Sequence, residues 1–527
     1  MVAQSAPDIL RQSDPEKLHR IRHSTSHILA MAVQKLFPGT KVTIGPATDD
    51  GFFYDFDRAE PFTPDDLKKI EKEMRRIVGQ KLPMVREEVP RDEMRTRLEA
   101  LGEPYKLEIF AGFDPAVPVT LYRTGDWWDL CSGPHVSATD EINPNAFKLL
   151  SVSSAYWRGD ASRPQLQRIR GTAWETPEQL EEYLRRQEEA KKRDHRKLGR
   201  ELGLFTFSDL VGPGLPLWTP KGTVLRQTLE DFLKAEQVKR GYQQVVTPHI
   251  ARVDLFKTSG HWFKYKEDMF PLMATGEDPG AEEGFVMKPM NCPFHIQIYK
   301  SELRSYRELP MRLAEFGTVY RYEQSGELGG LTRVRGFTVD DSHLFVTPEQ
   351  LEDEFKKVVD LIMFVFRSLQ LGDSFSARLS FRELGSDKYI GSDEVWEKAE
   401  SAIRKAAIDL GLPHFEARGE AAFYGPKLDF IFRDALGREW QLGTVQVDYN
   451  LPERFELEYV AEDNTRRRPV MIHRAPFGSI ERLVGILIEH YAGDFPLWLA
   501  PEQVRILPIK DAVVGYCEAV RDRLTAR

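Results

Sequence analysis

The sequence predicts an α+β protein with three or four domains. At about 150 residues per domain, its 527 residues are enough for that number of separate cores. Apolar residues recur with helical spacing in 23–37 and in 222–233. Between 316 and 343, two stretches of alternating apolar and polar residues flank a glycine-rich segment, which is typical of two strands joined by a turn. Together, these helical and hairpin segments predict the α+β class.

Composition narrows the kind of protein further. The chain has 73 Lys and Arg against 82 Asp and Glu, a net charge of −9, so RNA binding would depend on local basic patches and would weaken with salt. The three cysteines, Cys131, Cys292 and Cys517, are too sparse for a disulfide framework and favour a reducing compartment. The N-terminus lacks a secretory signal pattern, and no apolar run approaches ~18 residues. We therefore expect a soluble, cytoplasmic protein.

The first 170 residues combine a polar start, one helix and several short strands. We expect residues 1–20 to form a frayed polar tail. Residues 21–170 are expected to form a domain that opens with the helix 23–37, which Pro38 and Gly39 close. Short strands punctuated by Gly and Pro follow that helix.

Four chemically active side chains occur in this first block. His23 and His27 are four residues apart and share one face of the opening helix. Asp129-Leu-Cys-Ser-Gly-Pro-His adds Cys131 and His135. An H-x3-H pattern with a C-x3-H pattern has three interpretations: a zinc site, a cysteine hydrolase, or a polar pocket that activates water. A purely structural quartet is the remaining alternative.

A long charged helix is predicted within the linker 171–205. Thr176-Pro-Glu-Gln has the pattern of a capping box with proline at the first helical position. Basic residues between Arg185 and Lys197 are interspersed with glutamates. A solvated, salt-bridged surface helix is one interpretation, and an RNA contact is the other. The third block, 206–496, begins after this linker.

The hairpin in 316–343 is the most informative part of the chain. One of its faces can present four side chains: Arg321, Glu323, Arg333 and Phe337. A fixed guanidinium, a carboxylate and an aromatic ring suit the phosphate, the exocyclic amine and the base of a nucleotide. Judged by residue types alone, an ordinary hairpin with solvated charges explains the pattern as well.

The same hairpin closely resembles motif 2 of the class II aminoacyl-tRNA synthetases. Its continuation, Asp340-Asp-Ser-His, is similar to the threonyl-tRNA synthetase family in particular. The resemblance implies a class II catalytic core, an antiparallel sheet with helices, preceded by an α+β editing domain. It also implies that Arg321 grips the α-phosphate of ATP, that Glu323 accepts from the adenine amine, and that Phe337 stacks on the base. Arg333 is expected to bind ATP from the same hairpin.

Two further segments resemble the other motifs of this class. The helix 222–233 and the strand 242–247 resemble motif 1 at the dimer interface, and a core helix feeding a core strand is compatible with that role. The segment 478–487 resembles motif 3, with Arg482 placed to meet the outer phosphates of ATP, which is expected to bind with Mg²⁺. Gln441 and Thr444 match positions that contact the adenylate. Three motifs in the family's order form a specific signal.

A zinc site is implied by the resemblance. Cys292, His343 and His473 lie in three segments that match the family, whose structural signature is a Cys/His/His zinc site. Their spacing alone is not that of a zinc finger, and each residue considered singly is explained as a buried Cys or His. One thiolate and two imidazoles would leave an open coordination position. His295 is the nearest competing ligand.

Such a metal would explain the choice of amino acid. An apolar pocket separates a hydroxyl from a methyl group by only ~10²-fold, whereas a site that binds the hydroxyl can reach ~10⁴–10⁵. The resemblance places Asp341, Tyr424, Gln446 and Met290 around threonine. Lys427 and His261 match positions near the reacting carbonyl and the tRNA 3′ end, where a structural role is an equal alternative.

Serine carries the hydroxyl that this selection requires, so a second, hydrolytic site is expected. A missing methyl group provides only ~1–3 kcal/mol of discrimination. The quartet of His23, His27, Cys131 and His135 resembles the editing domain that threonyl- and alanyl-tRNA synthetases share. In the threonyl branch this pocket needs no metal, and Lys106 and Asp129 match further polar residues of it.

The resemblance covers about residues 21–496. The ubiquitin-like domain of bacterial members is not recognised, and 497–527 is expected to supply only the start of an anticodon-binding domain, a strand at 503–509 and a helix at 512–524. The expected function is that of a homodimeric threonine–tRNA ligase, which activates L-threonine with ATP, charges tRNA and hydrolyses Ser-tRNA. The alternative is a paralogue that forms threonyl-adenylate, or edits Ser-tRNA in trans, without efficient tRNA charging.

Overall fold

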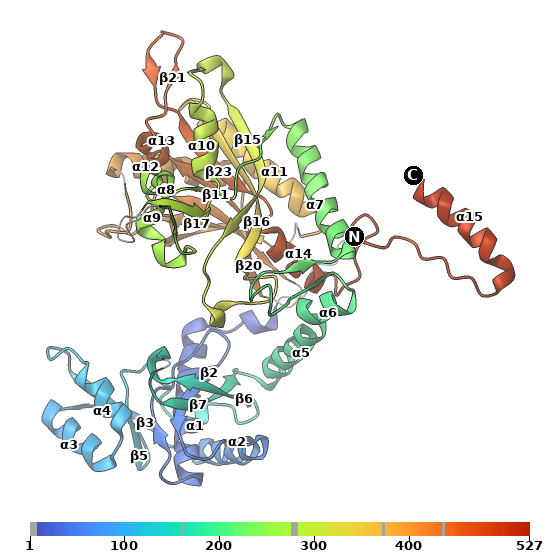
Figure 1. The fold of residues 1–527 in the computed structure, drawn as a ribbon. Helices are drawn as coiled ribbons and strands as arrows, with labels where there is room; N and C mark the ends of the chain where they lie inside the picture. The colour runs from blue at the N-terminus through green and yellow to red at the C-terminus, as the bar shows by residue number, and fades with distance from the viewer. Residues whose placement is uncertain are drawn as a thin grey trace. The chain divides into compact units, whose positions relative to one another are not determined.

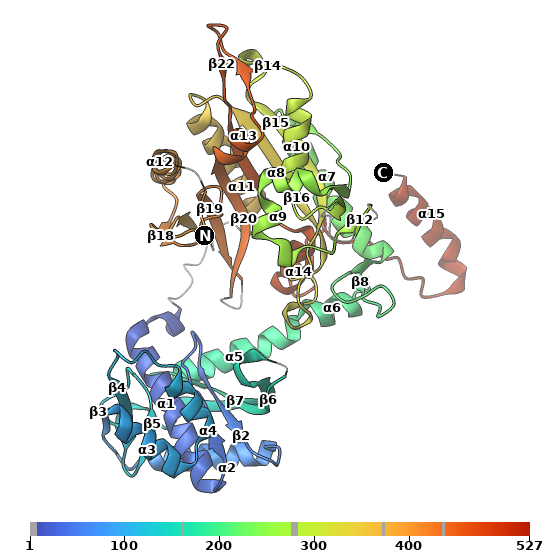
Figure 2. The same cartoon turned by 60° about the vertical axis from the view of Figure 1, so that its left-hand side comes forward.

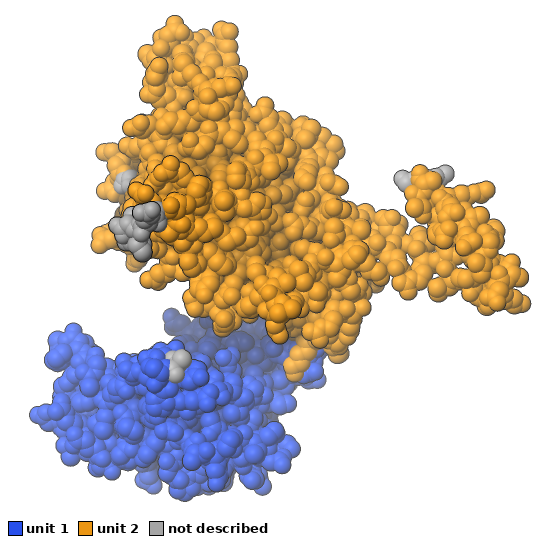
Figure 3. All heavy atoms as spheres, in the orientation of Figure 1, with its two compact units in different colours: residues 1–188 blue, residues 189–527 orange. Residues whose placement is uncertain are grey.

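A computed structural model describes residues 8–160, 162–275, 283–371, 375–390, 392–434 and 438–526. The chain forms two compact units, residues 1–188 and 189–527 (Figure 3). Each unit contains both helices and sheets, which confirms the predicted α+β class (Figure 1). None of the described helices is both long enough and apolar enough to span a bilayer.

The first unit is built on a four-stranded sheet in the order β1-β2-β7-β6. Its strands are β1 (Lys41–Val42), β2 (Phe52–Asp57), β7 (Gln165–Ala173) and β6 (Phe147–Tyr156). Two helices, α1 (Pro15–Leu36) and α2 (Pro64–Val78), supply the other side of the core. From α1, Ile28, Leu29 and Val33 pack in that core because their spacing puts them on one helical face.

A smaller layer completes the first unit. The sheet β3-β4-β5 consists of β3 (Met84–Val89), β4 (Val119–Thr124) and β5 (Trp127–Leu130), with α3 (Arg91–Leu101) and α4 (Pro104–Ala111) beside it. Met94, Leu98 and Leu121 form part of its separate core. Because β5 ends at Leu130, it delivers Cys131 directly from the edge of this sheet.

Residues 15–20 of the expected polar tail are helical rather than frayed. Helix α1 begins at Pro15, capped by the Asp14 side chain, and Leu18 is buried against Trp174 and Tyr183. A single apolar residue in a polar stretch gave no helical period, so the sequence alone did not reveal this packing. The predicted capping box at Thr176 is present, since Thr176 and Gln179 exchange backbone-to-side-chain hydrogen bonds of 3.2 and 3.3 Å. It starts α5 (Pro177–Arg193), which is followed by α6 (His195–Glu201).

The second unit is organised around an eight-stranded sheet in the order β10-β15-β16-β23-β20-β19-β17-β18 (Figure 2). The strands are β10 (Gln243–Gln244), β15 (Met311–Tyr320), β16 (Gly336–Val346), β17 (Phe375–Phe381), β18 (His414–Arg418), β19 (Lys427–Arg433), β20 (Glu439–Asp448) and β23 (Val470–Ala475). All neighbours pair antiparallel except the outer pairs β10–β15 and β17–β18. The antiparallel core expected from the class II resemblance is therefore present.

Helices cover the sheet and form the main core. Leu229, Ile362, Ile403 and Leu483 enter this core from α7 (Pro220–Lys239), α11 (Leu351–Ser368), α12 (Asp393–Asp409) and α14 (Ile480–His490). A second core contains Cys292 and Phe345. The remaining helices of the second unit are α8 (Val253–Ser259), α9 (His261–Lys264), α10 (Cys292–Lys300), α13 (Asn450–Arg454) and α15 (Val514–Thr525).

Short strand pairs complete the second unit. They are β8 (Phe205–Thr206) with β9 (Leu217–Trp218), β11 (Ile250–Arg252) with β13 (Gly284–Met287) and β12 (Met273–Ala274), and β14 (Arg304–Ser305) with β21 (Tyr459–Val460) and β22 (Arg466–Arg467).

Two local predictions are wrong in detail. The hairpin arms end at Tyr320 and start again at Gly336, so Arg321, Glu323 and Arg333 lie in the connecting loop rather than on strand faces. The Arg321 N–H still donates to the Arg335 carbonyl, but the ladder ends there because the Arg335 N–H donates to the Gly214 carbonyl instead. Within the loop, Gly330 has φ +61°. The strand expected at 503–509 is absent from the described residues, where no neighbouring strand pairs with it, whereas the expected helix is α15.

Candidate functional site

The candidate active site lies on the sheet face opposite the main core. Along β16, Leu344 and Val346 belong to the main core. Because side chains alternate along a strand, Asp341 and His343 face the other side. Side chains also alternate along β23, β20 and β19, where the neighbouring residues enter the main core. The following residues therefore lie on the same face as Asp341 and His343: His473, Thr444, Gln446, Lys427 and Asp429.

Cys292, His343 and His473 form one compact cluster there. His343 and His473 are directly opposite each other on β16 and β23, and Cys292 is the first residue of α10. Their ligand atoms lie within 4.8 Å of one another, and all three side chains are buried. Burial, and then the charges of Asp341 and Asp448, raises the pKa of the Cys292 thiol well above its usual value. This donor set fits a three-ligand zinc site, in which a cation would stabilise the thiolate.

Hydrogen bonds in the next layer orient the two imidazoles. The Asp448 carboxylate lies 2.9 Å from His473 Nε2. His343 Nδ1 lies 2.8 Å from His295 Nδ1, and His295 Nε2 lies 3.1 Å from Glu315. Both nitrogens of His295 are therefore engaged, which excludes it from the ligand set and makes it a support for His343. Since His343 Nδ1 and His473 Nε2 are engaged in these bonds, His343 Nε2 and His473 Nδ1 are the nitrogens available to a metal.

The residues expected around threonine border this cluster. Asp341 accepts a 3.1 Å hydrogen bond from Asn291 and approaches His343 Nε2 at 3.6 Å. The Tyr424 ring lies 5.4 Å from the ring of His473, and Gln446 pairs with His473 across β20 and β23. Met290, the fourth residue expected around threonine, instead lies with its sulfur 3.7 Å from the Arg321 guanidinium, which lines a neighbouring cavity.

A small cavity next to the cluster collects the loop residues of the hairpin. Its volume is about 190 Å³, and its lining includes Met290, Arg321, Glu323 and Arg333. The Arg321 guanidinium lies over the Phe337 ring at 5.1 Å, and Arg333 pairs with Glu323 at 2.7 Å. Two guanidinium groups, those of Arg321 and Arg333, therefore line the same cavity, which suits a polyanion.

Arg482 adds a third guanidinium to this region. Ser479 caps helix α14 by accepting from the Arg482 N–H, and the Arg482 Nε donates to the Thr332 carbonyl at 3.1 Å. Burial, followed by repulsion from Arg321 and Arg333, lowers the pKa of Arg482. Three mutually repelling guanidiniums are stable together only with an anionic partner such as the Glu323 carboxylate, or with bound phosphates.

The two residues expected to contact the adenylate, Gln441 and Thr444, converge on one carboxylate that the sequence analysis did not predict. Asp429 is completely buried, and its Oδ1 accepts from Gln441 and Thr444 at 2.8 Å each. Its Oδ2 binds Lys427 at 2.9 Å and Arg378 at 3.0 Å. The sequence pattern that could have identified Asp429 is its Lys-x-Asp spacing with Lys427, because alternate residues of a strand lie on one face. Arg378 lies on β17 and gave no such signal.

His261 lies at the inner edge of the cluster. It is fully buried, with Nδ1 2.7 Å from Ser259 Oγ and Nε2 4.0 Å from Cys292 Sγ. Burial, and then the charges of His473 and Arg321, lowers the pKa of His261 to about 3, so its ring is neutral. It can therefore act as a hydrogen-bonding group and not as a cation.

The first unit brings its four predicted residues together as well. His23, His27, Cys131 and His135 place their ligand atoms within 4.8 Å of one another. Cys131 Sγ lies 3.4 Å from His23 Nε2 and 3.3 Å from His135 Nε2. Burial raises the pKa of the Cys131 thiol to about 11, which disfavours the thiolate that a cysteine hydrolase needs.

A buried polar network adjoins this quartet. Lys106 and Asp129 form an ion pair of 2.5 Å, and the Tyr54 hydroxyl donates to Asp129 at 2.6 Å. His27 Nε2 lies 3.7 Å from the same carboxylate. Tyr54, which was not predicted from the sequence, belongs to the site because strand β2 directs its side chain to Asp129. Burial, and then Asp129, raises the pKa of Tyr54 well above its usual value, so the phenol keeps its proton.

Comparison with known proteins decides the family. Residues 274–491 match the tRNA synthetase class II core domain (G, H, P, S and T), and residues 119–170 match the threonyl and alanyl tRNA synthetase second additional domain. A threonine–tRNA ligase of Gloeobacter violaceus is 84% identical over 519 residues, which cover 98% of this chain and 83% of the relative. The chain belongs to the threonine–tRNA ligase family.

Other members of the threonine–tRNA ligase family agree with this membership. A threonine–tRNA ligase of Synechocystis sp. is 70% identical over 520 residues, which cover 98% of this chain and 86% of the relative. A crystal structure described as the RNA binding domain of threonyl-tRNA synthetase from Cryptosporidium parvum is 43% identical, with a TM-score of 0.60. The match covers 63% of this chain and 81% of the chain in that crystal structure.

Proposed function

We propose that this protein activates L-threonine with ATP, charges tRNA with it and hydrolyses seryl-tRNA. The observation that carries the proposal is that, in a threonine–tRNA ligase family member, a cluster on the sheet face adjoins a cavity lined by the hairpin loop. The Cys292, His343 and His473 cluster adjoins the cavity of Arg321, because Met290 contacts Arg321 and lies two residues before Cys292. The first group suits a hydroxyl-bearing amino acid, and the second suits ATP.

In the activation step, the threonine carboxylate attacks the α-phosphorus of ATP, and the bond to the β-phosphate breaks to release pyrophosphate. We assign Arg321 to the α-phosphate, with Arg333 and Arg482 on the outer phosphates. Glu323 takes the adenine amine, and Phe337 stacks on the base. ATP enters with Mg²⁺. Guanidiniums already fixed in place stabilise the charge that develops in such a transition state without reorganisation.

Zinc is the metal we propose for Cys292, His343 and His473. When bound, it would supply a Lewis-acid position for the amine and hydroxyl of threonine, which valine cannot satisfy. Asp341 accepts from the threonine hydroxyl, while Tyr424, Gln446 and Met290 shape the pocket.

The residues gathered by Asp429 hold the adenylate. Gln441 and Thr444 contact it, and Lys427 lies near the reacting carbonyl. In the transfer step, a ribose hydroxyl of the tRNA 3′ end attacks that carbonyl and AMP leaves. We assign His261, as a neutral ring, to hydrogen bonding near the tRNA 3′ end.

We propose residues 21–170 as the editing domain, 171–205 as the linker and 206–496 as the catalytic domain. In the editing domain, His23, His27 and His135 hold the water that cleaves the ester of seryl-tRNA into serine and tRNA. Lys106 and Asp129 bind polar groups of the substrate beside them. Cys131 serves as a neutral hydrogen-bonding group, as the raised pKa of its thiol favours. The partners are tRNA and a second copy of the chain, joined through α7, and the proposed location is the cytoplasm.

Three assays test the proposal: ATP–pyrophosphate exchange, tRNA charging and hydrolysis of seryl-tRNA. ATP–pyrophosphate exchange should depend on threonine, accept serine and reject valine, and threonine should be transferred to total tRNA. Exchange without charging would replace the proposal with that of an adenylate-forming paralogue. Charging with no release of serine from seryl-tRNA would remove the editing part alone.

A further inference from the structure

The loop that carries Arg333 has few internal contacts of its own. Between Gly329 and Arg333, the Thr332 N–H and hydroxyl both donate to the Gly329 carbonyl, at 3.1 and 2.7 Å, and the Gly329 N–H donates to the Arg333 carbonyl at 3.1 Å. Gly330 adopts φ +61°, a left-handed conformation. These short-range bonds shape the turn but do not fix its place on the catalytic unit.

His195 attaches this loop to the rest of the unit. The Leu331 N–H donates to His195 Nε2 at 3.0 Å, and both residues are buried. The approach is close, since a side chain on Gly330 would place its Cβ 2.3 Å from His195 Nε2. One residue further along, Arg482 holds the Thr332 carbonyl at 3.1 Å. The two contacts grip adjacent residues of the loop immediately before Arg333.

The protonation of His195 is set by its partners. A backbone N–H only donates, so Nε2 must accept and the proton must lie on Nδ1. The Nδ1–H donates to Glu489 at 2.6 Å, and the His195 backbone N–H donates to the same carboxylate at 3.0 Å. Asp194, His195 and Glu489 lie close enough together to hold a metal ion. Because both ring nitrogens of His195 are engaged in hydrogen bonds, these bonds explain the clustering, and no metal is required.

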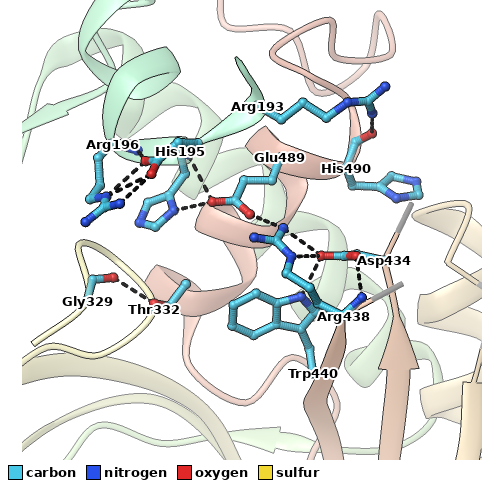
Figure 4. Close-up of polar contacts among 11 residues, drawn as sticks. Arg193, His195, Arg196, Gly329, Thr332, Asp434, Arg438, Trp440, Glu489 and His490 are labelled. Carbon is cyan, nitrogen blue, oxygen red and sulfur yellow. Dashed lines mark hydrogen bonds and ion pairs between the residues drawn. The ribbon is translucent and has the colours of Figure 1, made fainter. Parts of the chain in front are cut away.

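Glu489 is itself anchored by charge. It pairs with Arg438, which also binds Asp434 at 2.7 Å, and Asp434 accepts from the Trp440 indole at 2.9 Å (Figure 4). Burial alone raises the pKa of Glu489, but the hydrogen bonds from His195 and the charge of Arg438 outweigh it and lower the pKa below its ordinary value. The carboxylate is therefore charged and holds the imidazole in one tautomer.

We propose that His195 is a positioning residue for ATP: it fixes the loop 329–333 so that Arg333 and Arg482 meet the outer phosphates. This inference rests on the ATP roles proposed above for those two arginines. His195 follows α5 and Asp194, where the chain enters the catalytic unit. Through its contact with Leu331, it therefore attaches this entry point to the loop 329–333 as well as linking the units. The acceptor nitrogen of His195, rather than its bulk, carries the effect.

Two substitutions separate the two ring nitrogens. The amide of His195→Asn lies where Nδ1 lies, so it keeps the donor to Glu489 and leaves the Leu331 N–H without an acceptor. The longer side chain of His195→Gln brings its amide oxygen to the position of Nε2 and restores that acceptor. His490→Asn is the matched control, because the ring of this half-buried neighbouring histidine, the last residue of α14, packs against Phe432 and Tyr491. Arg482→Ala tests the underlying ATP assignment.

ATP–pyrophosphate exchange by the full chain measures the KM for ATP and for threonine, with thermal unfolding recorded in parallel. We expect His195→Asn to raise the KM for ATP about tenfold, the effect of one unsatisfied buried donor, while the KM for threonine stays unchanged. His195→Gln should recover most of the loss, and His490→Asn should match the parent.

The outcomes distinguish a positioning role of His195 from a purely structural role and test the ATP assignment separately. An unchanged KM for ATP in His195→Asn, or equal losses in the Asn and Gln variants, would overturn the positioning role. A lower unfolding temperature with parental kinetic constants would show that His195 only stabilises the fold, which also overturns it. If Arg482→Ala leaves exchange unaffected, the proposed ATP assignment itself fails.

Discussion

Replacing Asp429 with asparagine is predicted to weaken both the fold and the activation step. The change keeps the side-chain volume but removes the charge that two cations share at 2.9 and 3.0 Å, those of Lys427 and Arg378. Asp429 is fully buried, whereas the side chains of Lys427 and Arg378 are 19% and 22% exposed, so water reaches the cations in part. Removing one partner of a buried pair costs about 3–5 kcal/mol, and this partial hydration favours the lower end.

The expected loss of about 3 kcal/mol corresponds to a shift in Tm of about 4 °C for a unit of this size, given ~2 cal/mol/K of unfolding entropy per residue. Differential scanning calorimetry measures that shift. Activity should fall as well, because Gln441 and Thr444 both donate to the same carboxylate. ATP–pyrophosphate exchange at saturating threonine measures the activity.

Asp463→Asn is the matched control for this change. Asp463 pairs with Arg467 at 2.7 Å, but both side chains are about half exposed, so the variant should unfold near the temperature of the parent. If Asp429→Asn unfolds and activates threonine like the parent, then Asp429 does not organise this part of the site, and the reasoning from its contacts is refuted.

Three further predictions concern the proposed sites. Protein purified without chelator should contain close to one zinc per chain by metal analysis, and Cys292→Ser should lose it; a metal-free parent that still activates threonine and rejects valine contradicts the zinc site. Arg321→Ala should reduce ATP–pyrophosphate exchange by ~10²–10³ because a preorganised cation is lost, while circular dichroism stays parental; near-normal exchange would exclude its phosphate role. The double change His23→Ala and His27→Ala should let seryl-tRNA accumulate in charging assays while threonine activation is unaffected. Deacylation at the parental rate in that variant would make the quartet structural.

Local patterns predicted much of the chain correctly. The capping box at Thr176, the helix that carries His23 and His27, and the strand that carries His343 all depend on neighbouring residues, so their patterns are legible in the sequence. Gly330 lies in the loop where the glycine-rich segment predicted a turn. The boundaries were less accurate, because burial of Leu18 extends α1 beyond its visible apolar period.

Several parts of the site could not be predicted from local patterns. Asp429 gathers side chains from three strands, and His195 reaches a loop 136 positions away through Leu331. Tyr54 joins this site only because the fold brings its hydroxyl, from β2, to the Asp129 carboxylate on β5, a strand of another sheet. Each of these contacts is created by packing between distant segments, which leaves no periodicity in the sequence.

The sequence by itself determined the α+β class, the three motifs and the residue types of both sites, because helical and strand periods and turn residues act over a few neighbours. The tertiary structure alone decided which residues meet. Strand pairing puts His343 opposite His473, whereas both nitrogens of His295 are engaged by Glu315 and His343. The tertiary structure thereby distinguishes the two candidate metal ligands from the histidine that supports one of them. The physical reason is that strand register and side-chain burial bring together groups from distant parts of the chain, where a buried polar atom must find a partner.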